Sequence, residues 1–169
     1  MDDDDDAVGG PGIIVEIDES KFGKRKYNRG HRVDGCWVLG GVERTEARKL
    51  FVAVVADRSA KILLEVIMHH VKEGSIIYTD LWKSYGQINS ELGFDHFTVN
   101  HSKWFKDPNT GVHTNNIEGT WNGVKMTIAP RARTANSIEE RLLEFIWRRK
   151  HGEMLWVGLL TALKSNKYI

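Results

Sequence analysis

Residues 12–18 have the sequence GIIVEID, a short run of apolar, mostly β-branched residues that ends on an acid. This composition predicts a buried strand with Asp18 at its end. Residues 75–80, with the sequence SIIYTD, repeat the pattern and end on Asp80. If the first and fourth strands of the fold are neighbours in one sheet, we expect the two carboxylates to converge at one edge of it.

The rest of the chain supplies the other layers of an α/β fold. Apolar runs predict further strands at 36–44, 50–57 and 96–101, with TEAR (45–48) as a hairpin turn. Helical spacing of apolar residues predicts helices at 59–71, 81–92, 113–125, 137–150 and 153–164. The order β-β-β-α-β-α-β-α, followed by extra helices, predicts a mixed five-stranded sheet flanked by helices. That is the order of a ribonuclease H-like domain.

Length and composition predict one ordinary globular domain. The chain has 169 residues, of which 41% are hydrophobic and 28% charged. Residues 1–11 combine five aspartates with a Gly-Gly-Pro-Gly segment, so we expect a disordered tail there and the domain over 12–169. No apolar run approaches the ~18 residues of a membrane span, and no signal peptide is evident. A single cysteine, Cys36, excludes an internal disulfide and favours an intracellular location.

Charge is unevenly distributed along the chain. The formal net charge is +1, but the five aspartates at 2–6 contribute −5, so the remainder carries +6. Basic residues cluster at 21–32, 131–133 and 148–150, which together suggest a phosphate-facing side, although each run alone also fits a solvated surface. The candidate nucleic-acid-binding residues are Lys21, Lys24, Arg25, Lys26, Arg29, Asn115, Asn122, Lys125, Arg131 and Arg133.

The segment at 113–125, HTNNIEGTWNGVK, adds a third acid. A core stripe at helical spacing is formed by Ile117, Trp121, Val124 and Ile128. Beside the stripe run Glu118, Asn122 and Lys125, so one face packs while its neighbour presents an acid, an amide and a cation. The alternative is a capped surface helix, because Asn115 with Glu118 three residues later matches a capping box.

Two converging carboxylates need a partner. At ~4 Å their repulsion is of order 4 kcal/mol at an effective dielectric constant near 20. Either one carboxylate takes up a proton or a cation binds between them, and Mg²⁺ prefers such oxygen ligands. The alternative for Asp18 or Asp80 alone is a strand end that caps the next element. Glu16 and Glu19 flank Asp18, and we expect both side chains to point away from its face of the strand.

Four segments together resemble a known family of proteins. They are VEIDESKFGKRKYNRGHR (15–32), GGVER (40–44), IIYTDLWKSY (76–85) and GVHTNNIEGTWNGVK (111–125). In order and spacing they are similar to Merlin-type DDE transposases, the eukaryotic relatives of bacterial insertion-sequence transposases, over about residues 13–150. The resemblance implies a ribonuclease H-like fold with Asp18, Asp80 and Glu118 as a catalytic metal-binding triad. It also implies two Mg²⁺ ions, for which Mn²⁺ substitutes, during DNA strand cleavage and 3′-hydroxyl strand transfer.

The resemblance also implies partners and a location. The expected partners are DNA, as transposon ends and target, and a second copy in a homodimer or higher oligomer, without any membrane. A eukaryotic protein of this kind is expected in the nucleus. Such transposases usually carry an N-terminal DNA-binding module, so the sequence suggests an isolated catalytic core, a gene fragment or a domesticated descendant. Two alternatives remain: a non-catalytic DNA-binding protein that keeps the fold, and a metal-dependent nuclease.

Overall fold

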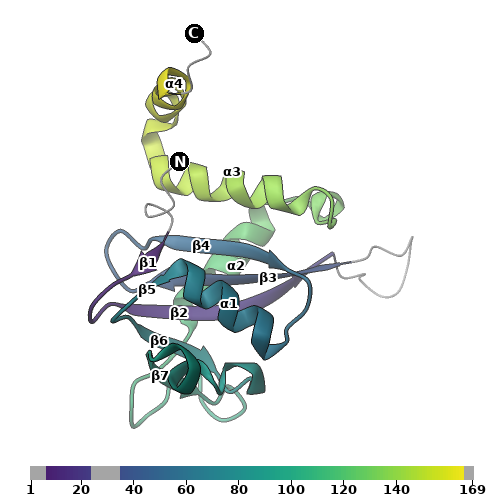
Figure 1. Cartoon of the computed structure of the whole chain (residues 1–169). Coiled ribbons are helices and arrows are strands. Elements are labelled where there is room, and N and C mark those ends of the chain that lie inside the picture. The colour runs from purple at the N-terminus through teal and green to yellow at the C-terminus, as the bar shows by residue number, and fades with distance from the viewer. Residues whose placement is uncertain (1–6, 24–34, 166–169) are drawn as a thin grey trace.

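A five-stranded mixed sheet forms the centre of the protein (Figure 1). The computed structural model describes residues 7–23 and 35–165, so the expected contacts of Lys24, Arg25, Lys26 and Arg29 lie outside the described residues. The strand order is β4-β3-β2-β6-β7. The strands are β2 (Ile14–Phe22), β3 (Cys36–Glu43), β4 (Leu50–Val55), β6 (Ile76–Asp80) and β7 (Asp95–Val99).

The direction of the strands changes at β2. Strand β3 pairs antiparallel with both β2 and β4, and the TEAR segment makes the predicted hairpin turn between β3 and β4. Strand β6 pairs parallel to β2, and β7 pairs parallel to β6. The predicted adjacency of the first and fourth major strands is therefore confirmed. In this pair Ile14 lies opposite Ile76 and Glu16 lies opposite Tyr78.

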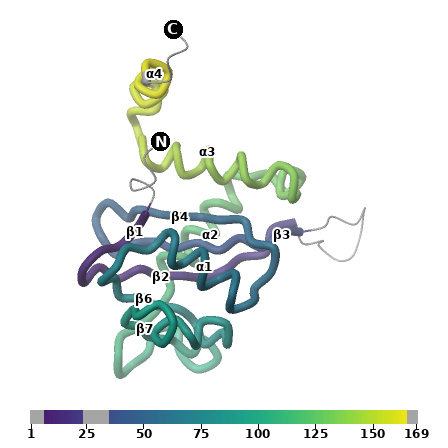
Figure 2. The backbone as a smooth tube through the Cα atoms, viewed as in Figure 1, coloured from purple at the N-terminus to yellow at the C-terminus, as the bar shows by residue number. Residues whose placement is uncertain are grey.

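Helices cover both faces of the sheet (Figures 1 and 2). Helix α1 (Ala60–His70) packs on one face, and helices α2 (Asn115–Thr127) and α3 (Ile138–His151) pack on the other. Alternate residues of β2 serve the two layers: Val15 and Ile17 join the α1 layer, and Phe22 joins the α2 layer. Short 3₁₀ helices at Pro130–Ala132 and Gly152–Met154 precede α3 and α4 (Leu155–Ser165).

The segment expected as one helix at 81–92 is instead two short helical turns. A 3₁₀ helix covers Lys83–Tyr85 and a π-helical turn covers Ile88–Leu92. The backbone N–H of Trp82 donates to Oδ1 of Asp80 at 2.8 Å, and Trp82 itself is extended, with φ −62° and ψ 129°. Because the aspartate holds Trp82 in this conformation, helical structure begins only at Lys83.

The ordered fold begins before residue 12. Strand β1 (Val8–Gly9) pairs parallel with β5 (Val71–Lys72), which directly follows α1. Val8 is only 1% exposed, and the Gly9 N–H donates to Oε1 of Glu43 at 2.7 Å. The expected disordered tail over 1–11 is therefore wrong from Ala7 onward, because one buried valine and a buried carboxylate anchor this segment.

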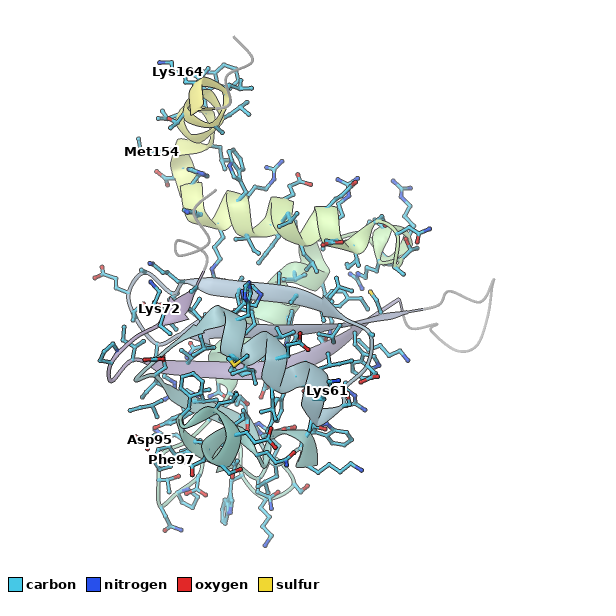
Figure 3. All side chains as sticks on the ribbon, in the orientation of Figure 1. Lys61, Lys72, Asp95, Phe97, Met154 and Lys164 are labelled. Atoms are coloured by element: carbon cyan, nitrogen blue, oxygen red, sulfur yellow. The ribbon has the colours of Figure 1, made fainter. Side chains whose placement is uncertain are left out.

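The C-terminal helix α4 extends away from the sheet (Figures 1 and 2). Figure 3 labels Met154 and Lys164 near its two ends. Its exposed apolar residues are Trp156, Val157, Leu159, Leu160 and Leu163. Within the described part of the chain, no helix combines the length and the apolar character that crossing a membrane requires.

Candidate active site

Asp18 and Asp80 lie on neighbouring parallel strands at matching positions. The offset of 62 residues that pairs Ile14 with Ile76 also relates Asp18 to Asp80, so both side chains belong to the same face of the sheet. Burial, together with the negative charges of Glu19 and Asp80, raises the pKa of Asp18 to about 7. The predicted convergence of the two aspartates is thus present in the structure, and such a pair attracts a cation or holds a proton.

A tryptophan of α2 fixes the orientation of Asp18. The Trp121 indole Nε1 donates a hydrogen bond to Oδ2 of Asp18 at 3.0 Å. Gly40, which pairs with Asp18 across β2 and β3, leaves the space that the indole ring occupies. A Cβ atom at Gly40 would lie 2.7 Å from the Trp121 ring. Trp121 therefore belongs both to the predicted core stripe and to the site, a second role that its spacing alone did not indicate.

Glu118 lies on α2, apart from the two aspartates. Its Oε1 accepts a hydrogen bond from the Thr114 hydroxyl at 2.9 Å and lies 3.3 Å from Nε2 of His101. The Glu118 side chain is 41% exposed. Across residues 7–23 and 35–165, no three His, Cys, Asp or Glu side chains are close enough to share a metal ion. The structure therefore brings Asp18 and Asp80 together but does not bring Glu118 into the same group.

The alternative of a capping box at Asn115 and Glu118 does not match the start of α2. The N-cap residue is Thr114, and its side chain makes no capping hydrogen bond to the backbone. Instead, a carboxylate from strand β2 accepts the hydrogen bonds of the first turn of α2. The Glu16 side chain is fully buried, and its Oε2 accepts hydrogen bonds from the backbone N–H groups of Asn116 at 2.8 Å and Ile117 at 3.2 Å. These are two of the N–H groups that a helix start leaves without intrahelical partners.

The expectation that Glu16 points away from the Asp18 face is wrong. Side chains two residues apart in a strand lie on the same face, so Glu16 and Asp18 both face α2, and only Glu19 points to the other face. Glu16 also accepts from Nδ2 of Asn116 at 2.7 Å and from Nε of Arg44 at 2.5 Å. The sequence contained this signal, because alternation applied strictly would have placed a second acid beside Asp18.

Arg44 extends this network to the His-Thr-Asn-Asn segment. Its Nη2 donates to the carbonyl oxygen of His113 at 2.7 Å, and its guanidinium lies 4.7 Å from the centre of the Tyr78 ring. Burial lowers the pKa of His113, and the positive charge of Arg44 lowers it further. One arginine thus joins strand β6, the loop before α2 and the carboxylate of Glu16.

The opposite face of the sheet carries a second network beside the aspartates. The Tyr85 hydroxyl donates to Oε2 of Glu19 at 2.5 Å, and Nη1 of Arg58 lies 3.0 Å from Oε1 of the same carboxylate. The Arg58 guanidinium also lies over two indole rings, 3.9 Å from the centre of Trp37 and 4.4 Å from that of Trp82. Burial raises the pKa of Tyr85 well above its usual value, so its hydroxyl remains a donor.

Two of the predicted nucleic-acid-binding lysines are within the described residues, and Lys125 is the one that interacts with Asp18. Lys125 is half-buried on α2, with its Nζ 5.5 Å from the centre of the Phe22 ring. Burial lowers the pKa of Lys125, as does the charge of Arg133, while the negative charge of Asp18 opposes both effects. Lys21 is exposed, and its Nζ lies 5.3 Å from the centre of the Trp37 ring. Lys125 belongs to α2, and Lys21 belongs to β2.

The other described candidates have different surroundings. Arg133 bonds to the end of α2 through Nε to the Ile128 carbonyl at 2.9 Å and through Nη2 to the Lys125 carbonyl. Arg131 and Asn122 are exposed. Oδ1 of Asn115 is buried and has no hydrogen-bond partner among the described residues. Arg133 therefore closes α2 in this structure, while Arg131 and Asn122 are accessible to a partner.

The fold and this site define an α/β domain in which two adjacent strands of a mixed sheet bring two carboxylates together, with a third carboxylate on a helix apart from them. Comparison with known proteins then identifies the family. The chain belongs to the ISXO2-like transposase domain family, which matches residues 6–135. This range includes the whole sheet, α1 and α2, and therefore all three predicted acids.

A protein of Haemophilus influenzae, described as an uncharacterized transposase-like protein, is 35% identical to this chain over 77 residues. The match covers 46% of this chain and 60% of that relative. The similarity thus extends over only part of the length of either protein.

Proposed function

We propose that this domain is the catalytic part of a DNA transposase, which cleaves a DNA strand and joins the freed 3′-hydroxyl to target DNA. Membership of a transposase domain family supports the reaction class. The observation that carries the proposal is the convergence of Asp18 and Asp80, where the negative charge of Asp80 helps to raise the pKa of Asp18. Such a pair suits a divalent cation.

The side chains at this site fit Mg²⁺ or Mn²⁺ as ligands. Carboxylate oxygens are the donors that Mg²⁺ prefers, and Asp18 and Asp80 supply them from rigid strands. Glu118 is proposed as the third ligand of a DDE triad. Its carboxylate is held by one hydroxyl and one imidazole on an exposed side, so a rotation about its side-chain bonds is enough to release it.

Each residue has a separate part in the proposed reaction. Bound divalent ions would supply Lewis-acid stabilisation of the negative charge that develops at the reacting phosphate. The Trp121 indole orients Asp18, and the backbone N–H of Trp82 orients Asp80. Glu16 holds the first turn of α2 against the sheet and so limits where Glu118 can move. Lys125 is proposed to contact a phosphate beside Asp18.

The strand order supports a ribonuclease H-like fold for the domain. Three antiparallel strands are followed by two parallel ones, with the acids on the central β2 and on the adjacent β6. Within the transposases, we propose a relationship to the Merlin type on the four segments quoted above. Transposon ends and target DNA as substrates, two ions per site and a homodimer are parts of the same proposal.

Nicking of a supercoiled plasmid in the presence of Mn²⁺ tests the proposal, because it requires no knowledge of the transposon ends. Asp80→Asn is expected to abolish nicking while leaving DNA affinity within about twofold, since a neutral amide is a poor metal ligand. The matched control is Asp95→Asn, an exposed acid at the start of β7, on the neighbouring strand (Figure 3). Equal nicking by the wild type and Asp80→Asn would contradict the proposed site.

The same assay separates the alternatives. DNA binding without metal-dependent nicking by the wild type would favour a non-catalytic DNA-binding protein. Nicking without any joining of a 3′-hydroxyl end to a second DNA would favour a nuclease. Joining of ends that depends on Asp18, Asp80 and Glu118 is the outcome that the proposal predicts.

A further inference from the structure

A basic cavity lies between the β3–β4 hairpin and the end of α3, away from the aspartates. Its volume is about 240 Å³, and one wall is formed by Ile146, Arg149 and Lys150 of α3. The residues that line it are Ala7, Val8, Ala47, Arg48, Lys49, Leu50, Ile146, Arg149 and Lys150. Four of these are cations and none is an acid. The cavity therefore presents positive charge from two elements that are distant in the sequence.

Two of these cations are held close to each other. Nη2 of Arg149 donates to the backbone carbonyl of Arg48 at 3.3 Å, which brings α3 onto the hairpin. Burial lowers the pKa of Arg149, and the positive charge of Arg48 lowers it further. Within the described residues, neither guanidinium is paired with a carboxylate. Two like charges placed together in this way are stabilised by an anion between them.

The backbone of the hairpin fixes the position of Arg48. Arg48 has a φ of +46°, a conformation that is rare for a residue with a side chain. Its backbone N–H donates to the carbonyl and to the hydroxyl of Thr45, at 3.2 and 3.1 Å. Its Nη2 donates to Oδ1 of Asn116 at 3.0 Å. The turn thus directs this side chain toward the start of α2.

A second cavity also has Arg48 in its lining. Its volume is about 280 Å³, and Arg44, Arg48 and His113 contribute to its lining. The remaining lining residues are Glu43, Thr45 and Asn116. Both cavities have Arg48 in their lining, and the two linings together include residues from the end of α3 to the first turn of α2, the helix that carries Glu118. We call the two cavities together the hairpin cleft.

A simpler explanation accounts for part of this charge. Cations at the end of a helix complement its dipole, and Arg148, Arg149 and Lys150 occupy the last turn of α3. Arg148 fits this explanation, because it bonds to Glu144 on its own helix at 3.0 Å. Arg149 does not, because its guanidinium reaches the hairpin instead. Lys49 and Arg48 lie outside any helix.

We propose that the hairpin cleft binds the phosphodiester backbone of DNA at a distance from the aspartates, with Arg48, Lys49 and Arg149 as the phosphate-binding residues. The inference rests on the proposed function, since it assumes that DNA is the substrate. Guanidinium groups suit this ligand because they bind phosphate through paired N–H donors. The cleft adds contacts to those expected near the aspartates and sets the direction in which the duplex leaves the site.

Fluorescence anisotropy with a labelled duplex of random sequence tests this inference, in EDTA so that no cleavage occurs. The variants are Lys49→Ala, Arg149→Gln and the double variant, and the control is Lys61→Ala, an exposed cation on α1 (Figure 3). Each single variant is expected to weaken binding roughly five- to tenfold at about 0.1 M salt and to lower the slope of log affinity against log salt by about 0.9, and the double variant is expected to lower the slope by about 1.8. The control is expected to match the wild type in affinity and in salt slope.

The outcomes separate the cleft from the proposed function. If the wild type binds DNA and the cleft variants bind with the same affinity and salt slope, the cleft inference is overturned and the transposase proposal stands. If the wild type does not bind DNA at all, both are overturned. Lys49 is exposed, so Lys49→Ala keeps the test decisive even if Arg149→Gln, in a half-buried position, fails to fold.

Discussion

Replacing Glu16 with alanine tests how α2 is held against the sheet. Glu16 is fully buried and accepts hydrogen bonds from two backbone N–H groups of α2 as well as an ion pair from Arg44. Hydrogen bonds to a charged group contribute about 1.5–3 kcal/mol each, but they are not additive within one network. Removal of one partner of a buried ion pair costs about 3–5 kcal/mol, since the other charge remains buried. We expect Glu16→Ala to lower the free energy of unfolding by about 4 kcal/mol.

Urea unfolding followed by circular dichroism measures this loss, and two comparisons locate its cause. Glu65→Gln, at an exposed position on α1, is expected to stay within about 0.5 kcal/mol of the wild type. In a double-mutant cycle, Glu16→Gln combined with Arg44→Gln is expected to cost less than the sum of the single changes by about 1–3 kcal/mol. A loss below about 1 kcal/mol for Glu16→Ala would refute the capping of α2 by Glu16, and additive effects in the cycle would refute its coupling to Arg44.

Three further predictions concern the site and its charge. Because the pKa of Asp18 rises from 3.8 to about 7 on folding, the contribution of Asp18 to the stability of the metal-free protein is expected to be complete below about pH 4 and to be lost, by at most about 4 kcal/mol, as the pH rises through 7; urea unfolding at several pH values checks this, and Asp18→Asn is expected to remove this part of the pH dependence. Gly40→Ala is expected to cost about 1–3 kcal/mol in the same assay because its Cβ meets the Trp121 ring, whereas Gly119→Ala, with open space around the new Cβ, is expected to cost nothing. Replacing the aspartates at 2–6 with serine raises the net charge from +1 to +6 and is expected to tighten DNA binding at low salt only, as measured by anisotropy.

The sequence predicted the architecture well, because the sheet depends on local patterns. Short β-branched runs predicted the positions of the strands, and the apolar stripe of α2 is buried as its spacing predicted. The adjacency of Asp18 and Asp80 followed from placing the first and fourth major strands together. These features are set by periodicity and strand order, which a single sequence contains.

What the sequence did not predict depends on contacts between distant residues. The segment at 81–92 has helical spacing, but the backbone N–H of Trp82 donates to the Asp80 side chain, and helical structure therefore begins only at Lys83. The role of Glu16 was missed because its neighbours across space, Arg44 and the start of α2, are distant in the chain. The position of Glu118 relative to the aspartates depends on how α2 packs, which periodicity alone leaves open.

The most direct test of the central claim is the anomalous diffraction of a crystal soaked in Mn²⁺, which requires no DNA substrate. The account predicts an anomalous peak between the carboxylates of Asp18 and Asp80, with Glu118 turned from Thr114 toward the ion. Saturating Mn²⁺ with no peak at the two aspartates, and with Glu118 still bonded to Thr114 and His101, would contradict it.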